Sequence, residues 1–206
     1  MHPSSKPTRT IWGLVLAAGL SRRMGSPKLI LPFEGRPMIQ HMIHSAVQSK
    51  LDGVAVVINP QWKELEDAVQ ASGADLIVRN EQAEQGMSTS LTEGLKLLPP
   101  EADAVMVLLG DQPHMQTATI DQLVERFYQV ENPIIQANYR GQKGHPVIFT
   151  RDLFPQLLKV KGDQGGKDII RSLSDQIEWV EFDNEPINDI DTMEDYARLI
   201  GKEVRR

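Results

Sequence analysis

A basic loop and two acidic segments contain the residues of this sequence whose types and spacing could do chemistry. The loop AAGLSRRMGSPK, residues 17–28, follows an apolar run and contains Arg22, Arg23 and Lys28. Its first three residues have little or no side chain, so a ligand could approach the backbone closely and N–H groups could converge on phosphate oxygens. Arg23 offers a forked donor for a polyphosphate, and Lys28 offers a compact charge. This composition favours phosphate binding, although a strand-to-helix loop with solvated charges would have the same composition.

The acidic segments GDQP (110–113) and NDID (188–191) supply carboxylates. Asp111 directly follows the apolar run AVMVLLG and would stand at the carboxyl end of a buried strand, where ligands collect in a doubly wound sheet. It could hold Mg²⁺, which prefers carboxylate, phosphate and water oxygens, or it could turn the chain into a following helix. In an extended segment Asp189 and Asp191 would share one face, which is costly unless a cation neutralises them. Asp191 could also cap the helix expected after it.

Two further segments carry weaker signals. GMSTSL (86–91) predicts a helix start rich in hydroxyl groups. Its free N–H groups, Ser88 and Ser90 could contact a nucleotide, with Gly86 and Ser88 the preferred contacts, or a capping box could begin at Ser90. RGQKGHP (140–146) contains His145, which could hydrogen-bond a second substrate or simply occupy a turn.

Two common nucleotide-binding motifs are absent from the sequence. A Walker A loop requires GxxxxGK[ST], but GDQGGKD at 162–168 has a different spacing and no Ser or Thr after Lys167. A dinucleotide fingerprint requires GxGxxG after the first strand, but Gly19 and Gly25 are separated by five residues with side chains. A nicotinamide-dependent oxidoreductase is therefore disfavoured.

Length, charge and cysteine content narrow the class of protein. The 206 residues suffice for one domain with a substantial core, and 22 Lys+Arg against 28 Asp+Glu argue against a surface that coats nucleic acid. The absence of cysteine excludes disulfides, thiolate metal sites and a Cys nucleophile, and it is compatible with a reducing cytoplasm. The N-terminal residues lack the apolar core of a signal peptide, and no stretch approaches 18 apolar residues. We therefore expect a soluble, cytoplasmic protein without a membrane span.

The elements that must position these residues alternate along the chain. Short apolar, β-branched runs predict buried strands at 11–16, 53–59, 74–80 and 104–110. Apolar residues at helical spacing predict helices at 37–50, 61–72, 88–98 and 117–130. This alternation predicts an α/β fold: a Rossmann-like, doubly wound, mostly parallel sheet with helices on both faces. From residue 133, PIIQANY, GHPVIF and IEWVEF predict a small C-terminal β extension packed over the sheet, followed by a closing helix from about 192. We expect residues 1–10 to form a flexible tail and 11–206 a single domain.

The loop and the acidic segments together resemble a known family. LAAGLSRRMGSPK resembles the signature loop of the MobA-like nucleotidyltransferases, roughly LAAGxSxRMGxxK. The similarity continues in the family's order through six further blocks: GRPMIQH (35–41), RNEQAEQGMSTSL (79–91), GDQPHM (110–115), GHPVIF (144–149), GDQGGKDII (162–170) and NDIDTMEDY (188–196). Seven blocks in order across nearly the whole chain make the resemblance specific. The family usually has Pro where this chain has Met193, a difference that removes no chemical group.

Within the family the chain looks most like the molybdenum cofactor cytidylyltransferases. The resemblance implies Mg²⁺-dependent transfer of CMP from CTP to the terminal phosphate of molybdenum cofactor, giving molybdopterin cytosine dinucleotide and pyrophosphate. It implies catalytic roles for Arg23, Lys28 and Asp111, and Mg²⁺ ligation by Asp111 and Asp191. It implies nucleotide contacts at Leu16, Ala17, Ala18, Gly19, Arg23, Lys28, Asn80, Gly86, Ser88 and Asp111. It implies acceptor contacts at Gln112, His145, Gly165, Gly166, Lys167 and Asp189, the glycines and Lys167 forming a lid.

Alternative functions stay open on the sequence alone. The same chemistry could use GTP and molybdopterin, or another small phosphate acceptor. LAAG instead of LAGG, together with GHP and GDQGGKD, resembles the cytidylyl branch more than the guanylyl branch. A different class would be a non-catalytic carrier of molybdenum cofactor for a hydroxylase-type enzyme, but carriage needs no pair such as Asp111 and Asp191. A xanthine dehydrogenase-type molybdoenzyme is the candidate recipient, and neither nucleic acid nor a membrane is an expected partner.

Overall fold

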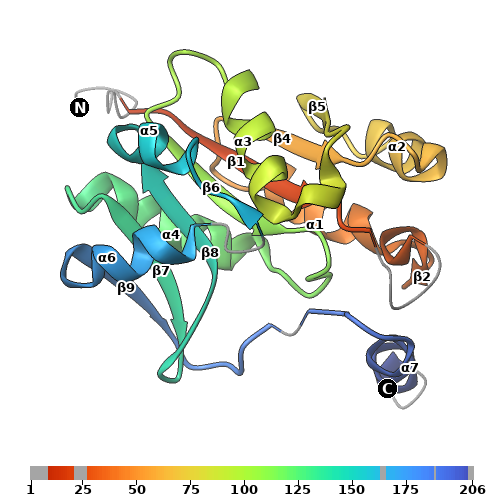
Figure 1. The fold of residues 1–206 in the computed structure, drawn as a ribbon. Helices are drawn as coiled ribbons and strands as arrows, with labels where there is room; N and C mark the ends of the chain where they lie inside the picture. Colours follow the sequence, from red (N-terminus) through yellow and green to blue (C-terminus); the bar gives the residue numbers. More distant parts are fainter. Residues whose placement is uncertain (1–8, 21–26, 163–165, 188, 204–206) are drawn as a thin grey trace, which may run out of the picture.

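A seven-stranded sheet lies at the centre of the part of the chain that the structure describes (Figure 1). The computed structural model describes residues 9–20, 27–162, 166–187 and 189–203. In spatial order the strands are β5 (Leu76–Arg79), β4 (Gly53–Ile58), β1 (Ile11–Ala17), β6 (Ala104–Leu109), β8 (Gln142–Thr150), β7 (Ile134–Tyr139) and β9 (Ile177–Phe182). The pairings are parallel except those of β8, which runs antiparallel to β6 and β7. The predicted mostly parallel α/β sheet is confirmed.

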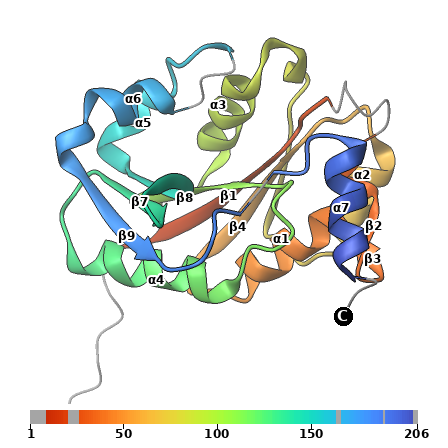
Figure 2. The same ribbon diagram turned by 90° about the horizontal axis from the view of Figure 1, so that it is seen from below.

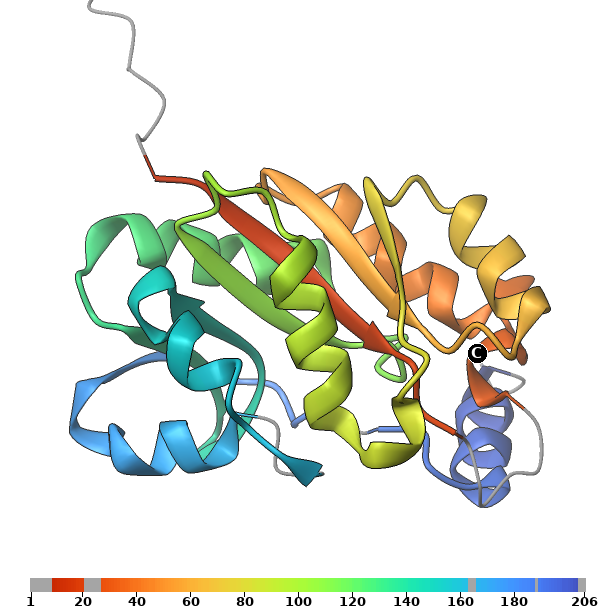
Figure 3. The same cartoon turned by 45° about the horizontal axis from the view of Figure 1, so that its top comes forward.

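Continuous apolar runs form the central strands because helices cover both faces of the sheet. Every residue of β4 is buried, and in β1 successive side chains enter two different cores, Val15 the first and Leu14 the second. The first core is closed by α1 (Met38–Val47), α2 (Lys63–Gln70) and α4 (Thr117–Gln129). The second is closed by α3 (Met87–Leu97), α5 (Phe154–Leu157) and α6 (Lys167–Ser172). Figures 2 and 3 show the two helix layers on opposite sides of the sheet.

A glycine lets α3 approach the sheet closely. A Cβ atom at Gly94 would lie 2.5 Å from Leu14 Cδ1 and 3.0 Å from Val57 Cγ2, so a side chain at this position would displace the helix. The close approach keeps the first turn of α3 beside the carboxyl end of β1, where the sequence predicts the ligand.

The last three strands continue the sheet beyond β6 and do not pack over it, which corrects the predicted position of the β extension. β8 pairs with β6 from Thr150 opposite Ala104 to Val147 opposite Val107, and β7 and β9 follow outward. Without β8, β6 would be an edge strand with a row of unpaired N–H and C=O groups on that side. The extension therefore completes the sheet that carries Asp111.

The C-terminal helix α7 (Met193–Glu203) stands apart from both helix layers. It packs on a small hairpin of β2 (Pro32–Phe33) and β3 (Arg36–Pro37), where Phe33 and Tyr196 share a small core. Residues 183–187 and 189–192, which we call the strap, lie between β9 and α7 and pass the carboxyl end of β6 (Figure 1). Its described residues form neither helix nor strand.

Short 3-10 helices connect several elements: η1 (Lys28–Ile30), η2 (Ala83–Gln85), η3 (Arg151–Leu153) and η5 (Ser174–Gln176). Within the described ranges, no helix is long and apolar enough to cross a membrane. The predicted tail, residues 1–10, lies mostly outside the described residues.

Candidate active site

A cavity of about 500 Å³ opens at the carboxyl edge of the sheet, beside the junction of β1 and β6. From β1 the chain proceeds outward to β4 and β5 and then returns to β6 on the other side of β1, so this junction is the topological switch point where α/β folds bind ligands. Most of the predicted nucleotide contacts line the cavity: Leu16, Ala17, Ala18, Gly19, Lys28, Gly86 and Asp111. The structure therefore brings these distant segments together.

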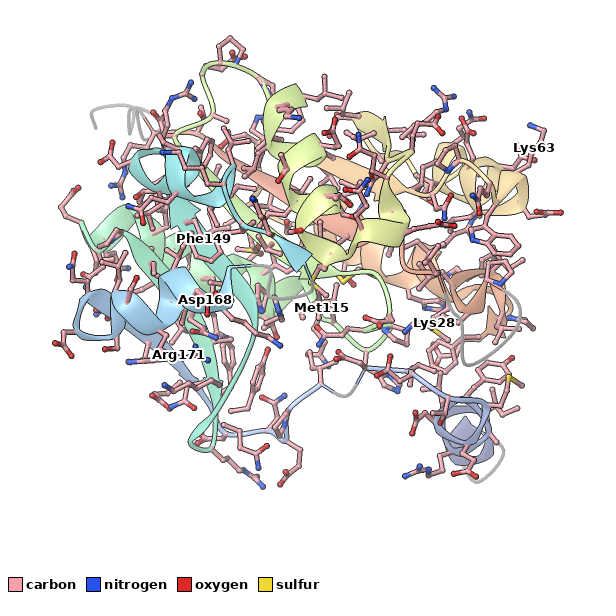
Figure 4. The ribbon with its side chains drawn as sticks, in the orientation of Figure 1. Lys28, Lys63, Met115, Phe149, Asp168 and Arg171 are labelled. Atoms are coloured by element: carbon pink, nitrogen blue, oxygen red, sulfur yellow. The ribbon has the colours of Figure 1, made fainter. Side chains whose placement is uncertain are left out.

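One lysine joins two carboxylates at the cavity wall. Lys28 Nζ donates hydrogen bonds to Asp111 Oδ2 at 2.6 Å and to Asp191 Oδ1 at 3.0 Å. Burial by itself would lower the pKa of Lys28. The charges of Asp111 and Asp191, and the hydrogen bonds that both carboxylates accept, outweigh burial and raise this pKa above the ordinary value. Lys28 is therefore a firmly charged cation, although only 9% of its surface is exposed. Figure 4 shows its side chain beside the strap.

The chemistry of this donor set fits a magnesium ion. Asp111 and Asp191 present hard oxygen atoms close enough together to share one ammonium group. Among the described residues there is no group of three or more His, Asp or Glu side chains that could enclose a metal. Mg²⁺ is typically bound by one or two carboxylates together with substrate phosphates and water, so a pair of carboxylates matches it.

Neither Asp111 nor Asp191 uses its side chain to cap a helix, which the sequence had left as an alternative to metal binding. Helix α4 is preceded by Gln116, so Asp111 caps no helix. At the start of α7, Asp195 Oδ2 accepts hydrogen bonds from the backbone N–H of Thr192 at 2.9 Å and from its hydroxyl at 2.7 Å. Thr192 and Asp195 form the cap, which leaves the Asp191 carboxylate directed at Lys28.

Gln112 lies in a different place from the one predicted for an acceptor contact. Its side chain is 4% exposed, and Nε2 donates to Asp189 Oδ1 at 2.8 Å and to the Ile187 carbonyl at 3.2 Å. Asp189 lines the cavity, and its contact with the acceptor stays a prediction. The residue is exposed as a whole, but desolvation of its carboxylate by surrounding protein atoms, followed by the charge of Asp111, raises its pKa.

The first turn of α3 presents a different serine from the one predicted. Gly86 precedes the helix with φ of 105°, a conformation that favours glycine. Both serines are buried, but only Ser90 is among the residues that line the cavity. Ser90 lies inside the helix, so the alternative of a capping box beginning there is wrong.

Asn80 supports this turn and does not line the cavity. It is fully buried, and its Nδ2 donates to Thr89 Oγ1 at 2.9 Å and to Ser90 Oγ at 3.0 Å. The buried amide thus fixes the Ser90 hydroxyl at the cavity wall. The spacing of Asn80 and Ser90 gives no local signal of this pairing.

The residues predicted to contact the acceptor lie farther along the edge. His145 belongs to β8 and not to a turn. Desolvation lowers the pKa of its imidazole; the charge of Asp111 acts in the opposite direction, and that of Lys167 in the same direction. Lys167 begins α6 and is exposed. Gly166 precedes it, and a Cβ there would lie 2.7 Å from Phe149 Cζ, so a side chain at this position would displace the Phe149 ring. Neither His145 nor these two residues lines the described cavity. In Figure 4, Phe149 lies well apart from Lys28.

Some predicted residues fall outside the described part of the chain. Arg22 and Arg23 belong to the segment 21–26, and Gly165 to 163–165. Their predicted roles stay predictions, as does the lid expected at 165–167.

Comparisons with known proteins extend over most of the chain. Residues 13–177 match the family model described as the MobA-like NTP transferase domain. The purine catabolism protein PucB of Bacillus subtilis is 30% identical over 193 residues, which cover 89% of this chain and 93% of PucB. The crystal structure of Rv0371c from Mycobacterium tuberculosis H37Rv is similar with a TM-score of 0.83 and 28% identity, covering 94% of this chain and 98% of that chain. A crystal structure of Rv0371c in complex with manganese gives a TM-score of 0.80 at 26% identity, covering 94% and 99%.

Proposed function

This chain belongs to the MobA-like NTP transferase family, and on that premise we propose that it transfers CMP from CTP to the terminal phosphate of molybdenum cofactor. Nucleotidyl transfer follows from the family. The observation that carries the proposal is the cluster of Lys28, Asp111 and Asp191 at the wall of a cavity beside backbone with small side chains. A cation and two hard carboxylates beside such backbone suit a triphosphate that is held with a metal ion.

The reaction needs no covalent nucleophile from the protein. A phosphate oxygen of the acceptor attacks the α-phosphorus of CTP in line, forms the new P–O bond and displaces pyrophosphate, which leaves with the electron pair of the broken bond. The protein's contribution is then position and charge. Lys28 keeps its proton at neutral pH because Asp111 and Asp191 raise its pKa, so it can oppose the charge that develops on the pyrophosphate.

Asp111 and Asp191 would hold a divalent metal ion. When bound, such an ion neutralises triphosphate charge and polarises the phosphoryl oxygens. A manganese complex of the similar protein Rv0371c supports this assignment. Two carboxylates from separate segments also ensure that the ion is held only when the strap is in place.

The choice of CTP over GTP is supported by the Ser90 hydroxyl. Its oxygen accepts a hydrogen bond from Asn80 Nδ2, and Ser90 lines the cavity, so the hydroxyl can donate its proton to a ligand there. Cytosine presents the acceptors O2 and N3 side by side, whereas the corresponding edge of guanine presents N–H donors. A donor fixed in this way favours the pyrimidine, since a mismatched base would leave buried polar groups unpaired.

The product would serve a xanthine dehydrogenase-type molybdoenzyme. Xanthine is a purine, and the similar protein PucB is named for purine catabolism. The absence of cysteine in the chain is compatible with the cytoplasmic setting that this role requires.

The function is tested by incubating the protein with Mg²⁺, molybdenum cofactor and either CTP or GTP, followed by mass analysis of the product and measurement of pyrophosphate. We expect pyrophosphate and molybdopterin cytosine dinucleotide in equal amounts with CTP, and much slower reaction with GTP. A preference for GTP would overturn the nucleotide assignment. Retention of cofactor without any pyrophosphate from either nucleotide would favour the carrier.

A further inference from the structure

We propose that Gln112 is a positioning residue that holds the strap against the end of β6 and thereby sets the spacing between Asp111 and Asp191. The sequence predicts an acceptor contact for Gln112, but the side chain is almost completely buried and is directed at the strap. The inference rests on the proposed role of Asp111 and Asp191 in binding the metal ion.

The amide nitrogen of Gln112 donates only to the strap, whereas its buried Oε1 has no hydrogen-bond partner among the described residues. Its Nε2 carries two hydrogen atoms, and they reach Asp189 Oδ1 at 2.8 Å and the Ile187 carbonyl at 3.2 Å. One residue earlier, the backbone carbonyl of Asp111 accepts a hydrogen bond from the N–H of Ile190 at 3.2 Å. Three hydrogen bonds thus join two consecutive residues after β6 to the strap, and the next strap residue is Asp191.

These bonds add to only a few other contacts in the described middle of the strap: Ile187 packs against the first core, and Glu185 pairs with Arg140. The described residues of the strap have no strand or helix ladder, so their backbone lacks the repeated hydrogen bonds that hold the sheet. At its far end Ile190 enters the small core formed with Phe33 and Tyr196. That core fixes where the strap ends, whereas the amide of Gln112 fixes how Asp189 and Asp191 face the cavity.

A neutral donor suits this position better than a charged one. Asp111, Asp189 and Asp191 bring three carboxylates to one side of the cavity. A cationic side chain at position 112 would compete with the metal ion for these carboxylates, and an anionic one would repel the strap. An amide satisfies Asp189 Oδ1 and leaves the net charge of the cluster unchanged.

Gln136 offers a matched control. Like Gln112 it is nearly buried (6% exposed), its Nε2 donates to a backbone carbonyl, that of Gly144 at 3.2 Å, and its buried Oε1 has no hydrogen-bond partner among the described residues. It lies in β7, and its amide donates to β8 and not to the strap. Replacing either glutamine by methionine removes the same buried amide at nearly the same volume.

The test is the binding of Mn²⁺ alone, measured by electron paramagnetic resonance without nucleotide, for the wild type, Gln112→Met, Gln136→Met and Asp111→Asn. Removing a group that orients a metal ligand typically weakens metal affinity on the order of ten- to a hundredfold. We expect that loss for Gln112→Met and a near-wild-type affinity for Gln136→Met. In turnover, Gln112→Met should raise the KM for Mg²⁺ and largely keep kcat at saturating Mg²⁺.

Equal Mn²⁺ affinities for Gln112→Met and Gln136→Met would overturn the inference. If Asp111→Asn still weakened Mn²⁺ binding in that case, the proposed metal site would stand, and only the role of Gln112 would be wrong. Unchanged affinity in Asp111→Asn would remove the metal site and the role of Gln112 together. If Gln112→Met does not fold, Gln112→Asn replaces it, since the shorter side chain keeps the amide but cannot reach Asp189, and the same comparison decides.

Discussion

The two sides of the cavity are built in different ways. On the sheet side, Ala17 ends β1 and Asp111 follows β6, two parallel strands whose backbone pairing fixes these positions. On the strap side, Asp189 and Asp191 depend on side-chain hydrogen bonds and on a small core under α7. The sheet side is therefore rigid by topology, whereas the strap side is placed by a few contacts between residues far apart in the chain. Removal of a metal ligand from the sheet side should impair turnover more than the loss of a supporting contact on the strap side.

Asp111→Asn should cause the largest loss. The change is nearly isosteric and removes one negative metal ligand from the rigid side, while the strand pairing of β6 stays intact. If about 3–4 kcal/mol of transition-state stabilisation is lost, the chemical step slows on the order of a hundred- to a thousandfold. Single-turnover pyrophosphate release measures the rate, and circular dichroism checks the fold. Near-wild-type rates would contradict the mechanism.

Lys28→Met should slow turnover on the order of ten- to a hundredfold, as expected for losing a charged hydrogen bond worth about 1.5–3 kcal/mol. It should also raise the affinity for Mn²⁺ alone, because the ammonium no longer competes for Asp111 and Asp191. The matched control is Lys63→Met, which changes an exposed lysine on α2 paired with Asp67 at 3.3 Å (Figure 4). A lower Mn²⁺ affinity in Lys28→Met would show that the lysine helps to hold the metal ligands in place.

Tyr196→Phe should loosen the strap side alone. The hydroxyl donates to the Pro32 carbonyl at 2.6 Å, and its loss should cost about 1 kcal/mol, or roughly 2–4 °C in Tm for a chain of this size. Mn²⁺ affinity should fall by a few-fold. Tyr139→Phe removes a similar bond, to the His145 carbonyl at 2.7 Å, from the sheet side. Tyr139→Phe should lower Tm without changing the affinity for Mn²⁺. If both variants changed this affinity equally, the two sides of the cavity would not differ as described.

Asp189→Asn should have the smallest effect on turnover, well below that of Asp111→Asn, because its oxygen can still accept the hydrogen bond from Gln112. Its clearer signature is in stability. The folded protein raises the pKa of Asp189 above the ordinary 3.8, so the folded state holds the proton more tightly and the carboxylate costs stability once pH rises above both pKa values. The variant should therefore melt slightly higher than wild type at pH 7, and the difference should vanish as pH falls toward 3.8. Thermal melts across this range would reveal an opposite trend if the assignment is wrong.

The same contrast explains what the sequence could predict. Asp111 was predictable because an apolar run followed by Asp places a carboxylate at a strand end, and parallel pairing then carries it to the edge where Ala17 lies. Gln112 was not, because its partners Ile187 and Asp189 lie more than seventy residues away and leave no periodic signal. The position of β8 was missed for a related reason, since an apolar strand does not specify which edge it will join.

Ser88 and Ser90 show that the first residue of a helix determines which side chain reaches the cavity. The hydroxyl-rich turn was recognised, but which serine faces the cavity depends on where the helix begins, and Gly86 with positive φ starts it at Met87. From that start Ser90 meets Asn80 and lines the cavity, whereas Ser88 is not among the lining residues. Helix boundaries are the least certain part of a sequence-based assignment, so the choice between neighbouring serines required the structure.

The most direct test of the central claim, that the two sides meet in one metal and triphosphate site, is a double-mutant cycle between Asp111→Asn and Asp191→Asn. Single-turnover pyrophosphate release would be measured at saturating CTP, molybdenum cofactor and Mg²⁺ for the wild type, both single variants and the double variant. If the two carboxylates serve one ion, the double variant should be about as slow as the slower single variant. A double variant slowed by the full product of the two single effects would mean that Asp111 and Asp191 act independently, and would contradict the shared site.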